Sequence, residues 1–571
     1  MLYDNIQSNT HESANINMKI DSNSGAMFNA YPDSLGKNLK DAVQFLACDE
    51  LKDAFRSFYI LPTVFNTDLD RGFSVISYDL CRSLASEEDL AALRAIGIDL
   101  TFDFILNHLS VLSPQFQDIL QNGDDSKYRH FFIDWNQFWE GRGEMTETGY
   151  IRPSPDQFNY GNLRKNGLPL LMIRLPDGRD VPYWNTFYQK VLYPHVTAPD
   201  MIKLTEGQYD RAARLAETIN RQLDAGKAPA DMDWCGFETE KAAAVDFLES
   251  RRQYMGQMDV NYQNPGVWEW YESVIRQLAG YGASMIRLDA FSRLHKAPAR
   301  SNFVNEPETW EILSKLRKMA EENNLEVLPE IHASYSKGYY KKLSDLGCMT
   351  YDYFLPGLIL DALDTGDAGM LYSWAEEIIR DNIKVVNMLG CHDGIPMRDV
   401  RGLLSEERVD AIIDRLVARG GHKKIVHGIK DEVYQLDITY YSALGCDDRK
   451  LELARAIQLF MPGKPQVWYM DLLAGASDED VLVRNPGTDT REVNRRCYSP
   501  EEARARLALP VVQKQLSLLK MRNTHPAFAE DATITAEHPT PGTLILTWCS
   551  GSAKATLTAD LAALTYHIET T

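Results

Sequence analysis

One short apolar segment of the sequence carries an arginine and an aspartate two positions apart: Ser284-Met285-Ile286-Arg287-Leu288-Asp289-Ala290-Phe291. Successive side chains of a β-strand point to opposite faces, so Arg287 and Asp289 would share one face. Charged groups at the end of a buried strand are expensive to desolvate. The segment therefore predicts either a buried structural ion pair or a functional site where the strand ends.

Segments of similar character lie on both sides of this one. Apolar runs that we expect to form strands cover residues 26–31, 58–62, 100–106, 284–289, 326–331, 349–354, 384–389 and 466–470. Helical patterns lie between them, for example at 39–51 and 87–95. Eight strand–helix units in succession favour a (β/α)8 TIM barrel, a fold of the α/β class, over the alternative of a doubly wound sheet.

Two intervals are too long for a single strand–helix unit. His108 and Asp289 lie 181 positions apart, whereas one unit of such a barrel needs about 30 residues. A hairpin pattern (171–174 and 181–184) and helical patterns (208–225 and 240–254) within this interval indicate an inserted domain after the third strand. A smaller insertion after the seventh strand is basic and polar at 415–430 and extended at 432–441. The expected organisation is a barrel of residues 1–107, 263–394 and 449–530, insertions at 108–262 and 395–448, and a small C-terminal β domain at 531–571.

The composition is that of an acidic globular protein. The 571 residues include 81 Asp and Glu and 60 Lys and Arg, which gives a net charge of −21. Such a charge repels nucleic acid and anionic membrane surfaces. Residues 1–24 lack the apolar core of a signal peptide, and no apolar run approaches the ~18 residues of a membrane span. Eight scattered cysteines without a C-x-x-C pair argue against a zinc site or a disulfide framework. We expect a cytoplasmic enzyme that binds neither nucleic acid nor membrane.

Polar side chains recur where four of the expected strands end, and such barrels place their active sites at these ends. The residues are His108 after the third strand, Arg287 and Asp289 in the fourth, Glu330 and His332 after the fifth, and His392 and Asp393 after the seventh. A single Asp or His at a strand end is more often a structural cap. Four such positions in order indicate one shared site.

Two of these carboxyl groups suit the cleavage of a glycosidic bond with retention of configuration. That reaction needs a carboxylate nucleophile and a carboxylic acid about 5 Å apart, and Asp289 and Glu330 on adjacent strands would meet this requirement. Arg287 would keep Asp289 ionised, and the apolar residues 327–329 would raise the pKa of Glu330. Three further side chains would hydrogen-bond the sugar hydroxyls: His108, His392 and Asp393.

These segments resemble the four signature regions of the α-amylase superfamily, glycoside hydrolase family 13, in the same order and on the same strands. Other segments resemble its sucrose phosphorylase branch: 31–39, 70–73, 113–118, 392–395, 440–446 and 491–495. The resemblance runs from about residue 25 into the tail and is weak between about 140 and 249. It implies a retaining glycoside phosphorylase, which cleaves an α-D-glucoside with inorganic phosphate to α-D-glucose 1-phosphate through a covalent β-glucosyl-enzyme.

The resemblance also implies a role for each matching residue. Asp289 matches the nucleophile, Glu330 the general acid/base and Asp393 the stabiliser of the transition state. The residues that match the glucose-binding subsite are Asp70, Phe73, His108, Gln257, Arg287, His392 and Arg495. Five residues are assigned to the acceptor and phosphate side, and they include positions where the chain departs from the branch: Arg152, Arg293, Glu432, Tyr434 and Gln435.

The departures from the branch gather on the leaving-group side. Ser292-Arg293 stands where sucrose phosphorylases carry Gly-Tyr, Glu432 where they carry Asp, and Pro396 where they carry Gly. Relatives in this branch act on sucrose, sucrose 6′-phosphate, glucosylglycerate or 2-O-α-glucosylglycerol. The polar leader differs from the helical extension of the glucosylglycerate enzymes, and a sugar phosphate would need a cationic cluster, for which only Arg293 stands out. By elimination we expect 2-O-α-D-glucosylglycerol as the substrate, with sucrose as the alternative.

The resemblance implies no cofactor and no metal, with inorganic phosphate as a co-substrate. Many α-amylases bind calcium near the residue that matches Asn107, whereas sucrose phosphorylases generally do not. The expected partners are a small-molecule α-glucoside and phosphate, and the chain would be a monomer or a homodimer. Two other hypotheses stay open at this point. One is an α-glucosidase or transglucosidase that uses water or another acceptor; the other is a non-catalytic relative, against which the set of three carboxyl groups argues.

Overall fold

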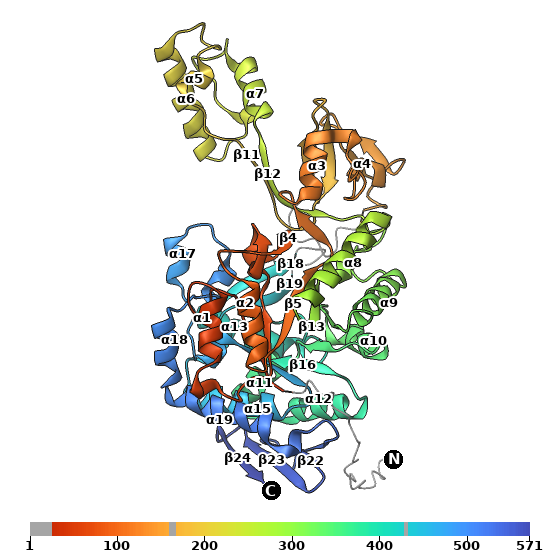
Figure 1. Ribbon diagram of the computed structural model, residues 1–571, viewed down its shortest axis with the longest axis vertical. Coiled ribbons are helices and arrows are strands. Elements are labelled where there is room, and N and C mark those ends of the chain that lie inside the picture. Colours follow the sequence, from red (N-terminus) through yellow and green to blue (C-terminus); the bar gives the residue numbers. More distant parts are fainter. Residues whose placement is uncertain (1–24, 159–166, 427–431) are drawn as a thin grey trace, which may run out of the picture. The chain divides into compact units, whose positions relative to one another are not determined.

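The computed structural model describes residues 25–158, 167–426 and 432–571 (Figure 1). Its central element is a sheet of eight parallel strands in the order β14-β13-β5-β2-β1-β20-β16-β15. The strands are β1 (Met27–Ala30), β2 (Ser57–Ile60), β5 (Asp99–Ile105), β13 (Ala283–Asp289), β14 (Glu326–Pro329), β15 (Thr350–Asp352), β16 (Val385–Met388) and β20 (Lys464–Trp468). The two end strands of this order, β14 and β15, lie next to each other, so the sheet closes almost completely. The predicted (β/α)8 barrel is confirmed.

Helices cover the barrel strands on the outside (Figure 1). They include α1 (Leu39–Leu46), α2 (Glu87–Ala95), α8 (Pro265–Gly280), α9 (Glu308–Glu321), α10 (Tyr339–Asp345), α15 (Asp448–Phe460) and α19 (Pro510–Thr524). Local signals in the sequence set where they begin. Ser86 and Asp89 form a capping box at the start of α2, in which each side chain accepts a hydrogen bond from the other residue's amide. Asn264 caps α8, and Pro265 occupies its first turn, where a missing N–H has no consequence.

A four-stranded antiparallel sheet forms the C-terminal part of the chain. It runs in the order β21-β22-β23-β24, with β21 (Thr533–Glu537), β22 (Thr543–Ser550), β23 (Ala553–Asp560) and β24 (Thr565–Thr570). Trp548 of β22 is fully buried, and its indole N–H donates to the carbonyl of Phe460 at the end of α15 over 2.8 Å. The predicted small C-terminal β domain is therefore present and packs on a barrel helix.

The described residues divide into two compact units. The first contains the barrel and the C-terminal sheet; the second consists of His108–Pro153 and Gly167–Asn261. The second unit holds a sheet of β6 (His108–Ser110), β12 (Gln253–Asp259) and β11 (Gln189–Leu192), and a hairpin of β9 (Leu170–Arg174) and β10 (Asp180–Trp184). Its helices α5 (Ala198–Met201), α6 (Tyr209–Asp224) and α7 (Lys241–Ser250) enclose a core of their own that includes Leu215, Ile219 and Trp234.

The segment after the seventh barrel strand belongs to the first unit. It contains α13 (Glu406–Ala418) and a small sheet in the order β17-β19-β18, formed by β17 (Ile395–Pro396), β19 (Glu432–Asp437) and β18 (His422–Val426). Residues 427–430 of the basic and polar stretch, like the polar leader 1–24, lie outside the described residues.

Two expectations about local structure are wrong. The helix expected at 240–254 ends at Ser250. Residues from Gln253 onward form β12, because 253–256 pair with β11 and 257–259 pair with β6. The extended stretch expected at 432–441 ends with β19 at Asp437. Thr439 then caps the short helix α14 (Tyr440–Ala443) through its hydroxyl, which accepts a hydrogen bond from the Ser442 amide. Strand pairing outweighed the helical pattern in the first case, and a helix cap outweighed the extended pattern in the second.

Two further observations concern cysteines and membranes. All eight cysteines lie among the described residues, and none forms a disulfide. Within the part of the chain that the structure describes, no helix combines the length and the apolar character that crossing a bilayer requires.

Candidate active site

Arg287 lies at the centre of a group of carboxyl side chains at the strand ends. It is 2 % exposed, and its guanidinium Nη1 donates to Asp103 of β5 over 2.5 Å and to Asp289 of β13 over 2.9 Å. Its Nη2 lies 3.0 Å from Glu330, the residue directly after β14. One planar guanidinium thus orients carboxyl groups from three neighbouring strands, a geometry that a lysine ammonium cannot reproduce.

The backbone after Asp289 leaves the strand through a left-handed residue. Ala290 has φ 53° and ψ 18°, a conformation that L-residues other than glycine rarely adopt. This turn directs the Ala290 amide to Glu330 Oε2, 3.2 Å away, while the Glu330 amide donates to the Leu288 carbonyl over 3.2 Å. The two backbone hydrogen bonds fix the Asp289 and Glu330 positions against each other.

The protonation of the Asp289–Glu330 pair differs from the expectation for Glu330. Burial and the neighbouring charge of Glu330 raise the pKa of Asp289 well above its usual range, although Arg287 lowers it. Burial also raises the pKa of Glu330, but Arg287 and His332 lower it by more, so the net direction is down. The expected rise from the apolar residues 327–329 is therefore outweighed by two cations. The pKa values of the two carboxyl groups therefore move in opposite directions, and Glu330 is the more readily ionised of the pair.

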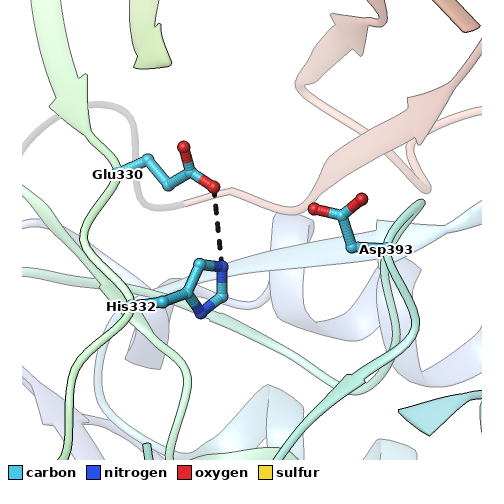
Figure 2. Close-up of side chains that lie close together, drawn as sticks. All are labelled: Glu330, His332 and Asp393. Atoms are coloured by element: carbon cyan, nitrogen blue, oxygen red, sulfur yellow. Dashed lines mark ion pairs between the residues drawn. The ribbon is translucent and has the colours of Figure 1, made fainter. Parts of the chain in front are cut away.

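His332 is a charged neighbour of Glu330. Its Nε2 lies 3.5 Å from Glu330 Oε1, and Figure 2 shows this ion pair beside Asp393. Its Nδ1 lies 3.2 Å from Asp399 Oδ2, and its ring stacks on Tyr353 with the centroids 3.8 Å apart. Burial lowers the pKa of His332, but Asp399 and Glu330 raise it to about 10, so the imidazole is protonated at neutral pH.

Asp393 follows β16 and is held by two arginines that do not belong to the Arg287 group. Arg491 Nη1 lies 3.0 Å and Arg495 Nη2 3.4 Å from its Oδ1. Against the effect of burial, His392 and these arginines hold the pKa of Asp393 well below its usual range, so it is ionised. Arg495 also donates from Nε to the His392 carbonyl over 2.8 Å. Asp393 is thus a fixed negative charge at the strand ends.

The predicted glucose subsite is brought together in part within the first unit. The rings of Phe73 and His392 stack with centroids 5.0 Å apart, and Phe73 also faces the Arg287 guanidinium at 5.6 Å. Burial lowers the pKa of His392 to about 3, so this imidazole is neutral and suited to hydrogen-bond hydroxyl groups. Asp70 accepts a hydrogen bond from Arg491, which links it to Asp393.

Three predicted site residues lie in the second unit. His108 stands opposite Asp259 in the β6–β12 pairing, and its ring is 4.9 Å from that of Phe187. Gln257, also in β12, accepts a hydrogen bond on Oε1 from the Tyr188 amide over 3.1 Å. Arg152 is exposed and lies in β8 (Ile151–Pro153). Their assignment to the site remains a prediction.

The acceptor-side candidates of the first unit occupy two segments. Arg293, in the turn after β13, is buried and faces the Phe303 ring at 5.2 Å. Glu432, at the start of β19, lies 3.2 Å from Arg398 Nε and 3.3 Å from Arg401 Nε.

Two further residues of β19 support the loop that carries Asp393. The Tyr434 carbonyl accepts hydrogen bonds from the Met397 and Arg398 amides, and the Gln435 amide group donates to the Asp393 carbonyl. These contacts tie β19 to the residues that follow the seventh barrel strand.

Three residues that the sequence interpretation did not assign also belong to this constellation. Asp103 pairs in register with Arg287 across β5 and β13, and burial raises its pKa to about 6. Arg491 and Asp399 contact Asp393 and His332, as described above. The position of a charged Asp103 within the third expected strand, which is otherwise mostly apolar, was a usable signal. Nothing local marks Asp399, which reaches His332 from a different loop.

Two features bear on the expectation that no metal is needed. Among the described residues, Glu330, His332 and Asp393 place oxygen and nitrogen atoms within 4.8 Å of one another, as metal ligands would. A protonated His332, however, has no lone pair to offer, so the set fits acid–base chemistry better than metal binding. At Asn107, the buried Lys296 ammonium donates to Oδ1 over 2.9 Å, so a positive charge is already in place there.

Comparisons with known proteins place this geometry in context. No family model matches the chain. The chain is 46% identical over 546 residues to the sucrose 6(F)-phosphate phosphorylase of Ilumatobacter coccineus, covering 94% of both chains. It is 30% identical to the sucrose phosphorylase of Streptococcus mutans, covering 95% of this chain and 96% of that one. It is 29% identical to the glucosylglycerol phosphorylase of Marinobacter adhaerens, covering 93% of each.

A solved structure agrees with these relatives. The crystal structure of sucrose 6F-phosphate phosphorylase from Thermoanaerobacter thermosaccharolyticum superposes with a TM-score of 0.78 at 28% identity, over 96% of both chains. The similarity at 46% identity thus extends over 94% of the chain, and the superposition extends over 96% of it. The chain therefore belongs to the sucrose phosphorylase branch of glycoside hydrolase family 13, and it is a glucoside phosphorylase that transfers glucosyl groups by double displacement.

Proposed function

We propose that the preferred substrate is sucrose 6F-phosphate, which the enzyme and inorganic phosphate convert to α-D-glucose 1-phosphate and fructose 6-phosphate. The observation that carries this proposal is the 46% identity over 94% of the chain to a phosphorylase of that name, against 29–30% for relatives named for sucrose and glucosylglycerol. It replaces our preference for glucosylglycerol, which rested on elimination.

Charge on the leaving-group side supports an anionic leaving group. In this mechanism Glu330 protonates the leaving oxygen, so we place the departing sugar on the side of Glu330 and His332. Arg398 directly precedes Asp399, the partner of His332, and its side chain is partly exposed. Its counter-ion in the empty enzyme is Glu432, one of the positions where the chain departs from sucrose phosphorylases. A phosphate ester could take the place of that carboxylate at the guanidinium.

The first chemical step uses the two carboxyl groups held by Arg287. Asp289 attacks the anomeric carbon, the bond to the leaving oxygen breaks, and Glu330 delivers a proton to that oxygen. Because the pKa of Asp289 is raised and that of Glu330 is lowered, productive binding has to place the proton of the pair on Glu330 and leave Asp289 ionised. Asp393, ionised and fixed by Arg491 and Arg495, stabilises the positive charge that develops on the sugar ring.

The second step reverses these roles. A phosphate oxygen attacks the anomeric carbon, the ester bond to Asp289 breaks, and Glu330 takes the proton from the attacking phosphate. Glu330 is then stabilised as an anion by Arg287 at 3.0 Å and by His332 at 3.5 Å. The same two contacts therefore favour the form of Glu330 that acts as a base. We propose that no cofactor is required.

A substrate panel tests the leaving group. Sucrose 6F-phosphate, sucrose and 2-O-α-D-glucosylglycerol are each incubated with and without inorganic phosphate, and glucose 1-phosphate and free glucose are measured. We expect glucose 1-phosphate from all productive substrates, with the highest kcat/KM for sucrose 6F-phosphate. A higher value for glucosylglycerol or sucrose would overturn the substrate proposal. Free glucose without glucose 1-phosphate would instead support a hydrolase.

A charge variant separates recognition of the phosphate ester from catalysis. Arg398→Gln removes one guanidinium from the leaving-group side and leaves the Asp289–Glu330 pair untouched. We expect KM for sucrose 6F-phosphate to rise about tenfold or more, because a charged hydrogen bond is worth about 1.5–3 kcal/mol. KM for sucrose should change little. Arg408→Gln, which breaks a pair with Asp361 between helices α11 (Leu355–Thr365) and α13, is the matched control. Equal effects on both substrates would exclude Arg398 from phosphate recognition.

A further inference from the structure

Glu330, His332 and Asp399 form a chain of three side chains from two separate loops. Glu330 and His332 follow β14, and Asp399 belongs to the segment after β17. The two nitrogens of His332 contact different carboxylates, with Nε2 3.5 Å from Glu330 and Nδ1 3.2 Å from Asp399. The imidazole therefore bridges the predicted acid/base and a carboxylate that no assigned role accounts for.

Asp399 is held more rigidly than a surface carboxylate. It is 2 % exposed, its Oδ1 accepts a hydrogen bond from the Ala333 amide over 3.1 Å, and its carbonyl accepts one from the Tyr335 amide over 3.0 Å. Both amides belong to the segment that carries His332. The carboxylate and the imidazole are thus fixed relative to each other by the backbone as well as by their own contact.

Every charged group around His332 can be named. Glu330 approaches from its own segment, Asp399 from the loop after β17, and Asp393 from the loop after β16, with ligand atoms within 4.8 Å. The Tyr353 ring covers one face from the end of β15. The guanidinium of Arg287 contacts Glu330 as well, 3.0 Å from the same oxygen. Among the described residues, three carboxyl groups lie close to the ring, and the cation Arg287 contacts Glu330 rather than the imidazole, which favours the imidazolium form.

We propose that Asp399 is a positioning residue for the acid/base: it orients His332 and keeps it as a charged hydrogen-bond donor against Glu330. The inference rests on the proposed double-displacement reaction. The contact of the imidazolium with Glu330 Oε1 orients the carboxyl group, and once Glu330 carries a proton the nearby positive charge makes it a stronger acid toward the leaving sugar oxygen. The covalent steps themselves are unchanged; only the readiness of Glu330 to release its proton depends on Asp399.

Leaving groups of different quality test this role. Asp399→Asn is compared with the wild type on sucrose 6F-phosphate or sucrose, whose leaving oxygen needs a proton, and on α-D-glucosyl fluoride, whose fluoride needs less help. We expect kcat for the sugar substrate to fall about 10- to 100-fold, up to the lower limit of the ~100- to 10,000-fold range for general acid–base catalysis, because Glu330 itself stays in place. For the fluoride it should stay within about threefold of wild type. Equal losses on both substrates would show that Asp399 has only a structural role and would overturn the proposal.

The pH dependence of kcat/KM is a second measurement, and a purely structural role of Asp399 would leave it unchanged. Without the Asp399 carboxylate, the pKa of His332 falls and the imidazole loses its charge at lower pH. A neutral His332 stabilises the Glu330 carboxylate less, so Glu330 keeps its proton to higher pH. The alkaline limb of kcat/KM for the sugar substrate is therefore expected to move upward by a measurable fraction of a pH unit. An unchanged limb would contradict the proposal.

Two further variants guard against an unfolded protein. His332→Gln removes the imidazolium while Asp399 stays, and the same selective loss on the sugar substrate is expected; the double variant should lose little more than either single one. Asp361→Asn is the matched control, an equally buried aspartate paired with Arg408. It should alter stability but not the ratio between the two substrates. Formation of glucose 1-phosphate by the wild type from the fluoride tests the proposed phosphorylase reaction separately from the role of Asp399.

Discussion

At the scale of single residues, the arrangement around Arg287 assigns different duties to similar side chains. Asp289 and Glu330 share its guanidinium, yet their pKa values move in opposite directions because only Glu330 also contacts a second cation, His332. Asp393 is held ionised by two other arginines. Three carboxyl groups in one site can thus serve as nucleophile, acid/base and electrostatic stabiliser.

Replacing the nucleophile should remove turnover and leave the fold intact. For Asp289→Asn we expect kcat with any glucosyl donor to fall by about 10⁴-fold, because the amide cannot form the glucosyl ester. The thermal midpoint should change little or rise, since a carboxyl with a raised pKa is lost from a buried site. Stopped assays of glucose 1-phosphate and a thermal melt measure both quantities. Activity within tenfold of wild type would remove Asp289 from the mechanism.

His332 should make stability depend on pH in the alkaline range. Its pKa is about 10 in the folded protein and about 6.5 in an unfolded chain. A raised folded pKa gives stabilisation that is complete below pH 6.5 and is lost as pH rises toward 10, by at most about 1.4 kcal/mol per pH unit. Urea midpoints between pH 6 and 10 should therefore fall less steeply for His332→Gln than for the wild type. Parallel curves would contradict a protonated His332.

The carboxyl groups that we propose as catalytic lie in a recognisable local pattern of the sequence. Asp289, Glu330 and Asp393 follow apolar strand segments, and in the structure all three lie at strand ends around Arg287 and its neighbours. Asp399 and Arg491 carry no such mark, because their importance comes from contacts with residues 67 and 98 positions away. The direction of the pKa shift of Glu330 was predicted wrongly for the same reason. Its apolar neighbours are visible in the sequence, whereas only the fold brings Arg287 and His332 into contact with it.

At the scale of elements, the turn after β13 connects backbone strain with the site. Ala290 has φ 53°, and its amide donates to Glu330. Strand position and apolar character were predictable here, since residues 284–289 were expected as a strand and β13 covers Ala283–Asp289. The left-handed turn was not, because alanine gives no signal for a positive φ. The errors at 240–254 and 432–441 have a similar origin, in pairing and capping that local periodicity does not report.

Substitutions at Ala290 test whether this strain supports the site. For Ala290→Val we expect the free energy of unfolding to fall by about 1–2 kcal/mol or more, since a β-branched side chain disfavours the left-handed region. The kcat should fall with it because the amide to Glu330 shifts. Ala290→Gly adopts this φ readily, so stability and kcat should stay close to wild type. If valine and glycine behave alike in both chemical denaturation and kcat, the turn has no influence on Glu330.

At the scale of the whole molecule, the C-terminal sheet stabilises the barrel from one end. Arg522 of α19 lies over the rings of Trp548 and Phe528, at 4.2 and 4.7 Å, and donates to the Gly463 carbonyl over 3.0 Å. The guanidinium is fully buried, and burial lowers its pKa to about 9. This buried cation depends on aromatic faces from the C-terminal part of the chain.

Removing that aromatic contact should lower the free energy of unfolding and leave kcat unchanged. For Trp548→Ala we expect a loss of about 3–5 kcal/mol, as for large buried aromatic residues, with kcat of the folded fraction unchanged. Trp310→Ala, at a half-buried tryptophan on α9, is the control and should cost clearly less. Thermal melts and assays at a temperature well below the transition provide the comparison. A change in kcat with unchanged stability would contradict this division of roles.

Treatment with a chelator tests whether the enzyme needs a metal. The Lys296 ammonium donates to Asn107, and His332 is protonated beside Glu330, so we expect EDTA to leave both activity and the thermal midpoint unchanged. Lys296→Met should lower stability, because it leaves the Asn107 oxygen without its charged donor. Activity that is lost in EDTA and returns with calcium would show that a metal is needed.

The insertion after β5 separates two neighbouring barrel strands widely along the chain. Arg287 and Asp103 are 184 positions apart, and closing a loop of that length from an unfolded chain costs about 4–5 kcal/mol of chain entropy. The second unit has its own core, and its pairing of His108 with Asp259 brings its two ends side by side. Once this unit has folded, β5 and β13 are joined by a short effective connection. Folding of the inserted unit first would therefore turn the longest-range pairing of the barrel into a nearly local one.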